Sequence, residues 1–174
     1  IGHTDGPVHA STMGGNIHIG RAGAMVSART AGGRIEVREA GGIVLAGNSG
    51  GSIQVGSAPG VRCESTGGSI RLKGSSGALR AVTDVGSIMA ELFPGIALQD
   101  SLFSTGAGDI TVYIPSNFPV TVRALNDNIR SGRIISDFSE IVVRQKSAEG
   151  SLNGGGPVLQ LTSNGGTIYL RRQR

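Results

Sequence analysis

Hydrophobic and polar positions alternate along the first two thirds of this chain in two short runs per repeat of about 18 residues. The second run begins at an isoleucine that follows a Gly-Gly pair, as in GGNIHI at 14–19 and GGRIEV at 32–37. Seven copies of this run place an isoleucine at the same point: Ile17, Ile35, Ile53, Ile70, Ile88, Ile110 and Ile168. A short fixed period is typical of stacked repeat architectures.

The first run of each repeat shows three apolar or small positions that share one parity, ahead of the central isoleucine. Nine residues before it stand Val8, Val26, Val44, Val61 and Leu79. Seven residues before it stand Ala10, Ala28, Ala46, Cys63 and Ala81. Five residues before it stand Thr12, Thr30, Asn48, Ser65 and Thr83. A period of two predicts a strand with one buried face, so these columns should all point inward.

Glycine pairs interrupt the alternation between the two runs, where a tight corner needs positive φ or a close backbone approach. The predicted corner glycines are Gly14, Gly15, Gly32, Gly33, Gly50, Gly51, Gly67, Gly68, Gly165 and Gly166. Each coil then has two short strands and two glycine corners. The fold class predicted is all-β, a single-stranded parallel β-solenoid in which two sheets face each other. The alanine column would let these sheets approach closely.

The period predicts one domain over 1–174, with regular coils at 1–112. Residues 113–153 hold prolines and most of the aromatic residues, which favours irregular or decorated coils that cover the open end of the solenoid. Residues 154–174 restore a terminal coil, because Leu159, Leu161 and Ser163 precede Ile168 at the same three offsets.

Other solenoid classes fit the spacing less well. Left-handed hexapeptide helices place an aliphatic residue every six positions, whereas here the strong columns lie nine apart. Calcium-binding repeats carry an Asp in the glycine corner. Here the residue after the second glycine is Asn16, Arg34, Ser52 or Ser69, so no calcium and no other cofactor is expected.

Charge and composition limit the classes of partner that we expect for this chain. The net charge is +4, but the basic residues are spread along the chain and interleaved with acidic ones, without aromatic stacking partners. We therefore expect no nucleic-acid binding. No apolar run approaches 18 residues, so we expect no membrane span in this segment. Because the chain opens at Ile1 in the middle of repeat-like sequence, we expect an upstream segment that would hold any targeting peptide.

The inward and outward positions of the columns argue against a catalytic or metal site in the regular coils. Cys63 lies in an inward column, where a thiol behaves as a small hydrophobe, and no activating partner is visible. His3, His9 and His18 are close in sequence, but His9 and His18 face outward on opposite sheets, so no metal site is expected. The Thr12 to Thr83 column should hydrogen-bond the corner backbone, which is a better account than an ice-binding array.

The outward residues are the remaining candidates for a binding or catalytic surface. The outward carboxylates Glu36, Glu64 and Asp109 are scattered, so a sugar-cleaving acid pair is expected, if anywhere, in 113–153. Outward apolar residues, Leu45, Val82 and Met89, are modest evidence for a partner surface.

The GGxIxV coils, YIPSNFPVTV at 113–122, the ISDF stretch and the ending GGGPVLQLTSNGGTIYLRR together resemble a bacterial adhesin-like domain family of unknown function. The likeness spans essentially the whole chain. Members have glycine-punctuated β-solenoid repeats closed by a similar glycine-rich coil, and no established catalytic residues. Many carry an Asp after the glycine pair, which only Asp109 matches here. The resemblance implies an envelope-associated or secreted bacterial protein.

The resulting hypothesis is a non-enzymatic adhesin-like or scaffold module that presents a repetitive surface to a protein or polysaccharide partner. One alternative is a structural polymer that self-associates through the solenoid ends, as bactofilin-like filaments do. The other is a carbohydrate-active β-helix.

Overall fold

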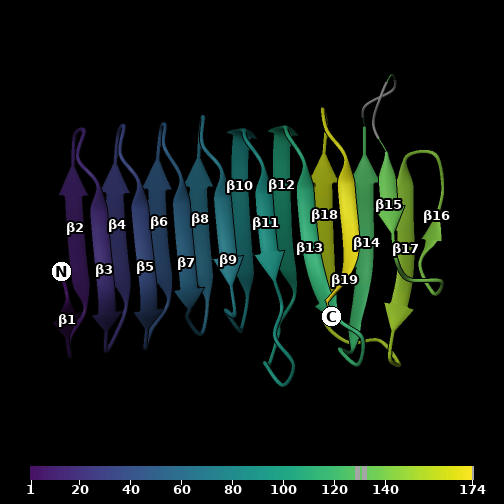
Figure 1. Cartoon of the computed structure of the whole chain (residues 1–174), viewed down its shortest axis with the longest axis horizontal. Helices are drawn as coiled ribbons and strands as arrows, with labels where there is room; N and C mark the ends of the chain where they lie inside the picture. The colour runs from purple at the N-terminus through teal and green to yellow at the C-terminus, as the bar shows by residue number, and fades with distance from the viewer. Residues whose placement is uncertain (128–129, 131–132, 174) are drawn as a thin grey trace.

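The structure, a computed structural model, describes residues 1–127, 130 and 133–173. Five residues of the segments predicted at 113–153 and 154–174 lie outside these ranges. The described residues form strands and connecting turns without a helix, and the strands stack into a flattened solenoid with coils about 18 residues apart (Figure 1). The predicted all-β parallel β-solenoid is confirmed.

One wall of the solenoid is a nine-stranded sheet. It contains the second strand of each coil, which begins at the central isoleucine. Its strands, in spatial order, are β1 (His3–Thr4), β3 (Ile17–Ala22), β5 (Ile35–Ala40), β7 (Ile53–Ser57), β9 (Ile70–Lys73), β11 (Ile88–Glu91), β13 (Ile110–Pro115), β19 (Ile168–Gln173) and β15 (Ile134–Ser136). All neighbours in this sheet are parallel, and the isoleucines pair directly from coil to coil. Ile134 joins that column beside Ile168, although it follows no glycine pair.

The facing wall is a ten-stranded sheet. From the N-terminal end its strands are β2 (Val8–Thr12), β4 (Val26–Thr30), β6 (Val44–Asn48), β8 (Val61–Ser65), β10 (Leu79–Val85), β12 (Ser101–Ala107), β18 (Val158–Ser163), β14 (Val120–Asn126), β17 (Ser147–Leu152) and β16 (Val142–Val143). The strands from β2 to β14 are parallel, whereas β17 runs antiparallel to β14 and β16 antiparallel to β17.

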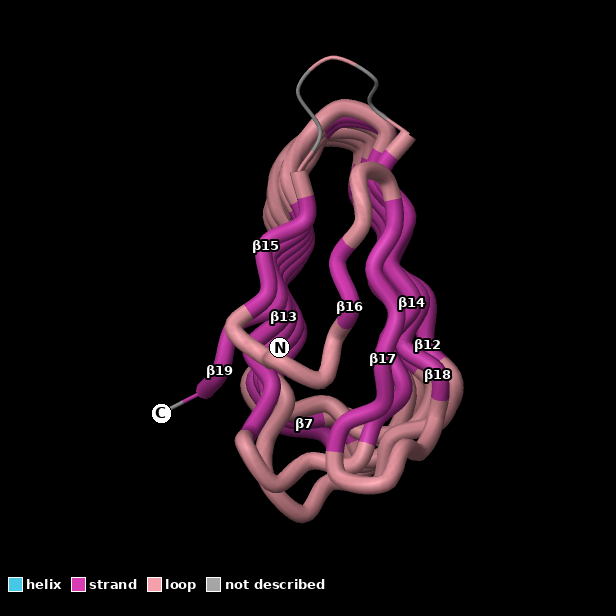
Figure 2. Tube along the Cα trace, turned by 90° about the vertical axis from the view of Figure 1, so that its right-hand side faces the viewer, coloured by secondary structure: helices cyan, strands magenta, loops and turns pink. Residues whose placement is uncertain are grey.

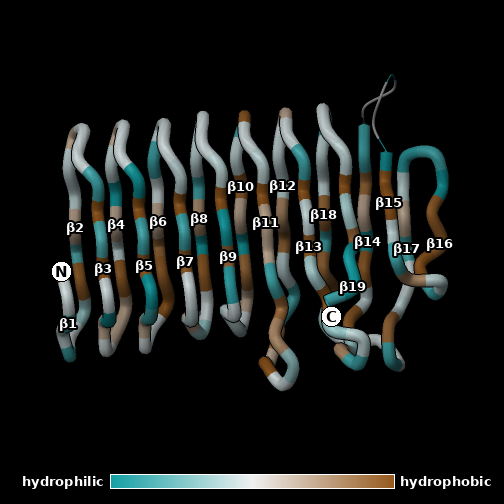
Figure 3. Tube along the Cα trace, in the orientation of Figure 1, coloured by the Kyte–Doolittle hydropathy of each residue, from teal (hydrophilic) through white to brown (hydrophobic). Residues whose placement is uncertain are grey.

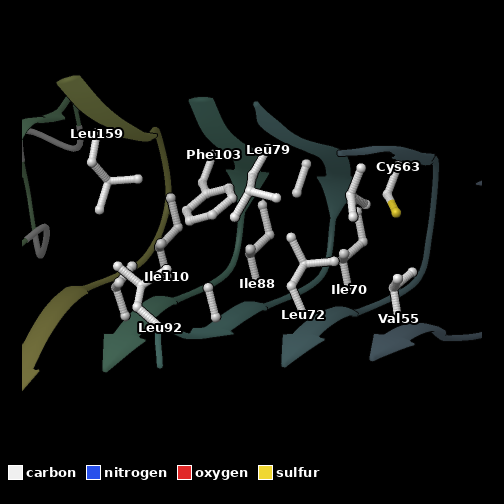
Figure 4. Close-up of a cluster of buried hydrophobic side chains, with 14 of the residues drawn as sticks. Val55, Cys63, Ile70, Leu72, Leu79, Ile88, Leu92, Phe103, Ile110 and Leu159 are labelled. Atoms are coloured by element: carbon white, nitrogen blue, oxygen red, sulfur yellow. The ribbon is translucent and has the colours of Figure 1, made fainter. Parts of the chain in front are cut away.

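The core fills the narrow space between the two sheets. Hydrophobic and hydrophilic residues alternate along the strands (Figure 3), and the inward set is almost wholly buried. Side chains from both sheets meet there, including Leu79 and Phe103 from one wall and Ile88 and Ile110 from the other (Figure 4). The alanine column gives way to Phe103 and Leu161 in the later coils, where both are fully buried.

The last coil in sequence is not the last coil in space. After β13 the chain passes to β14, which does not pair with β12; β18 lies between them. In the opposite sheet β19 likewise lies between β13 and β15. Residues 158–173 therefore fill a slot that the preceding segment leaves open, an arrangement that the sequence reading, in which 154–174 simply followed 113–153, did not anticipate.

The segment after β15 covers part of the C-terminal end. β16 lies across the end of the solenoid, between the two walls (Figure 2). Around it Phe138, Ile141, Ala148 and Leu152 are buried and join the core. The antiparallel β16 and β17 thus replace the parallel edge that a further coil would present at this end.

Candidate functional site

The predicted inward columns are buried except in the first coil, where Ala10 and Thr12 are half-buried. Each isoleucine of the column from Ile17 to Ile168 is at most 8% exposed, and Val26, Val44, Val61 and Leu79 are at most 2% exposed. Cys63 is fully buried, with its sulfur in the core (Figure 4). Burial raises the pKa of its thiol by desolvation, which disfavours the thiolate that nucleophilic chemistry requires.

The three histidines do not converge. His9 on β2 and His18 on β3 are exposed on the outer faces of different sheets. His18 lies beside Glu36 at 3.4 Å and His3 beside Asp5 at 3.0 Å. No group of three or more His, Cys, Asp or Glu side chains that could hold a metal ion occurs among the described residues. Nor does any described helix have the length and hydrophobicity of a membrane span.

A ladder of small polar side chains ties most coils to the glycine corner of the coil before them. The hydroxyl of Thr30 donates to the carbonyl of Gly15 at 3.0 Å, and that of Thr83 donates to the carbonyl of Gly68 at 2.9 Å. Asn48 takes the same place with its amide. Thr105, Ser163 and Asn126 continue the ladder in the later coils. These side chains satisfy corner carbonyls that would otherwise be buried without a donor.

The two glycines of each corner have different roles. A Cβ on Gly33, Gly68 or Gly166 would collide with the backbone of the preceding coil, so the second glycine is required for close stacking. A Cβ on Gly14, Gly32 or Gly50 would meet nothing within 4 Å. Among the ten corner glycines only Gly51 has positive φ. Close approach rather than backbone conformation therefore explains the second position at Gly33, Gly68 and Gly166, whereas packing does not require the first glycine at Gly14, Gly32 or Gly50.

The candidate site is a shallow hollow of about 630 Å³ on the outer face of the ten-stranded sheet, over β4, β6, β8 and β10. We call it the Gly47 trough. Its main lining residues are Arg29, Leu45, Gly47, Arg62, Glu64 and Asp84. Strand pairing sets Gly47 directly between Arg29 on β4 and Glu64 on β8. Because Gly47 has no side chain, the surface is hollow between the long side chains of Arg29 and Glu64.

Ionic contacts organise the wall of the trough. Arg62 pairs with Glu64 along β8, with the guanidinium Nε 3.5 Å from the carboxylate. Arg29 and Asp84 are exposed at opposite sides of the hollow. Two guanidinium groups and two carboxylates therefore face one open surface, and such groups can hold a polar ligand in a defined orientation.

The outer face of the nine-stranded sheet carries ion pairs and a contact between an arginine and an aromatic ring. Arg21 lies 3.6 Å from Glu39, and Lys73 lies 3.7 Å from Glu91, each pair joining neighbouring coils. The guanidinium of Arg171 stands 4.9 Å from the ring centroid of Tyr169. The two ion pairs join adjacent coils on the solvent side, whereas the Arg171–Tyr169 contact lies within β19.

The sequence predicted that several residues of the Gly47 trough face outward, but it did not predict that they line one hollow. Leu45 and Val82 were identified as outward apolar residues, and both line it. Glu64 was treated as one of several scattered carboxylates, yet Glu64 and Asp84 line the same hollow, which lies in the regular coils and not in 113–153. The missed signal was Gly47, a glycine at an outward strand position rather than at a corner.

No protein-family model matches this chain, and comparisons with curated proteins and with solved structures also find no match.

Proposed function

We propose that this protein is a non-enzymatic, adhesin-like surface module that works at the bacterial cell envelope or outside the cell by presenting a repetitive binding face. The observation that carries the proposal is the strict register of successive coils, which sets outward side chains in rows at the strand spacing of about 4.8 Å. On the ten-stranded sheet one such outward row contains Leu45, Arg62 and Arg80. A polymer lying across the strands would meet one side chain from each successive coil at this regular spacing.

Binding rather than catalysis is supported by the form of the Gly47 trough. The hollow is shallow and open, and the Glu64 carboxylate is engaged with Arg62. Glycoside hydrolysis uses two carboxyl groups held on either side of the scissile bond. An open sheet face holds a ligand without enclosing a reacting bond.

The test is to immobilise the protein and measure binding of polysaccharides and extracellular proteins, each at several chain lengths, together with any shortening of the bound chain. We expect affinity to rise steeply with ligand length, because repeated weak contacts on one chain add through effective concentration. Shortening of a bound polysaccharide would replace this function with the carbohydrate-active alternative. Absence of binding to every polymer would remove the proposal.

A further inference from the structure

Gly47 is an exception among the glycines within strands. The described strands contain five: Gly20, Gly47, Gly56, Gly106 and Gly150. In four of them an added Cβ would run into a backbone oxygen of a neighbouring strand or loop, so packing explains the glycine. At Gly47 the nearest atom to an added Cβ is the Glu64 carbonyl oxygen, 3.8 Å away, which is ordinary contact. Gly47 also lacks positive φ.

A glycine within a strand weakens it, since it gains no packing and loses the most conformational entropy on folding. Neither sterics nor backbone conformation accounts for Gly47. Close approach of another molecule to the backbone is one of the roles that glycines serve within strands, and the open space at Gly47 is compatible with it. The missing side chain leaves an open trough of about 630 Å³ above Gly47, so the backbone of β6 is accessible there from solvent.

The lining of the trough indicates the chemistry of that molecule. Arg29 and Arg62 only donate hydrogen bonds, the carboxylates Glu64 and Asp84 only accept them, and the hydroxyls of Ser49 and Thr66 do both. A ligand dense in hydroxyl groups satisfies all three kinds of partner at once. The two arginines and two carboxylates carry no net formal charge, so a polyanion has no electrostatic advantage here.

Apolar residues complete the match. Leu45 is 36% exposed and Val82 is half-buried, and both line the same hollow. Their methyl groups can cover the C–H face of a sugar ring while the polar side chains bond its hydroxyls. A protein segment would meet no free strand edge here, because β6 is paired on both sides by β4 and β8.

We infer that the Gly47 trough binds a segment of a neutral linear glycan, which lies over the bare backbone of β6 between Arg29 and Glu64. This inference rests on the proposed function and assigns its ligand class and its site.

The experiment uses the full chain and isothermal titration calorimetry with hexasaccharides of glucose and of N-acetylglucosamine, with oligogalacturonate as the polyanionic probe. A Gly47→Arg variant fills the trough, and the open space at this position should leave its thermal midpoint close to that of the wild type. Gln54→Arg adds the same charge on the outer face of the opposite sheet and is the matched control. We expect Gly47→Arg to weaken binding of a neutral hexasaccharide at least about tenfold, and Gln54→Arg to leave it unchanged.

Three results would overturn the inference. Equal affinity of Gly47→Arg and wild type would place the glycan elsewhere and leave the proposed function intact. Binding of oligogalacturonate or of a protein, with no binding of the neutral probes, would reject the ligand class alone. Failure of the wild type to bind any polymer would reject the inference together with the proposed function. If Gly47→Arg misfolds, Arg29→Ala and Gly47→Ser replace it, and both should weaken the same titration.

Discussion

At the residue scale, the glycines of this chain differ in what an added side chain would meet. The second glycine faces the backbone of the preceding coil at Gly33, Gly51, Gly68 and Gly166, where an added Cβ would collide with it. The first glycine faces open space at Gly14, Gly32 and Gly50, and Gly47 faces the trough. Inward hydroxyls such as that of Thr83 donate to a corner carbonyl of the preceding coil, here that of Gly68. Glycine content alone thus reflects at least two different requirements.

The two corner glycines should differ sharply on substitution. Gly33→Ala forces a Cβ into the Gly15 carbonyl, and we expect it to lower the free energy of unfolding by about 1–3 kcal/mol. Gly32→Ala meets open space without positive φ and should be neutral or stabilising by up to about 1 kcal/mol, because alanine restricts the unfolded chain. Urea unfolding followed by circular dichroism measures both. Similar losses in the two variants would contradict this division of roles.

At the element scale, the unusual feature is the insertion of the last coil. β18 supplies the hydrogen-bonding partner of both β12 and β14, and β19 does the same for β13 and β15. The irregular segment 113–153 is therefore joined to the regular coils mainly through strands that come after it in sequence. We therefore expect its fold to depend on the C-terminal segment.

Removing residues 158–174 should separate these two parts of the molecule. We expect backbone amides of β14 and β17 to lose protection against hydrogen exchange, while β3 to β10 keep theirs, since each repeat is stabilised mainly by its neighbours. Hydrogen-exchange mass spectrometry compares the shortened chain with the full chain. Gln160→Ala, an exposed change on β18, is the control and should leave the exchange pattern unaltered. Retained protection of β14 would mean that it can close directly onto β12.

At the scale of the whole molecule, the two ends of the solenoid differ. The N-terminal end of the ten-stranded sheet presents β2, which pairs with β4 in parallel. The other end carries β16 and β17, antiparallel to their neighbours, with Val142 and Val143 exposed. A head-to-tail polymer needs complementary ends that continue the same register. The unlike edges disfavour the filament alternative for the full chain.

A chain shortened to residues 1–115 should behave differently. It would present β12 and β13 as parallel edges, in the same orientation as the edge strands β2 and β1 at the other end. Free edges of this kind pair with other chains, so we expect concentration-dependent fibres in electron micrographs of the shortened chain. The full chain at the same concentration is the control and should remain free of fibres. Fibres from the full chain would restore the polymer alternative.

The sequence by itself determined the coil. Its period of about 18 residues, the parity of its columns and its glycine corners specify two facing parallel sheets, because a strand alternates its side chains strictly and each coil repeats the same pattern. The burial of Cys63 and the divergence of His9 and His18 followed from parity alone.

Only the tertiary structure decided which coils are neighbours and where a surface becomes hollow. Ile134 and Ile168 pair although the sequence places the cap between them, because spatial order depends on which strand edges are free and not on chain order. The Gly47 trough likewise needs Arg29, Gly47 and Glu64, each from a different coil, to lie side by side. Periodicity fixes the direction of each side chain, but the shape of a surface depends on the lengths of neighbouring side chains, which do not repeat.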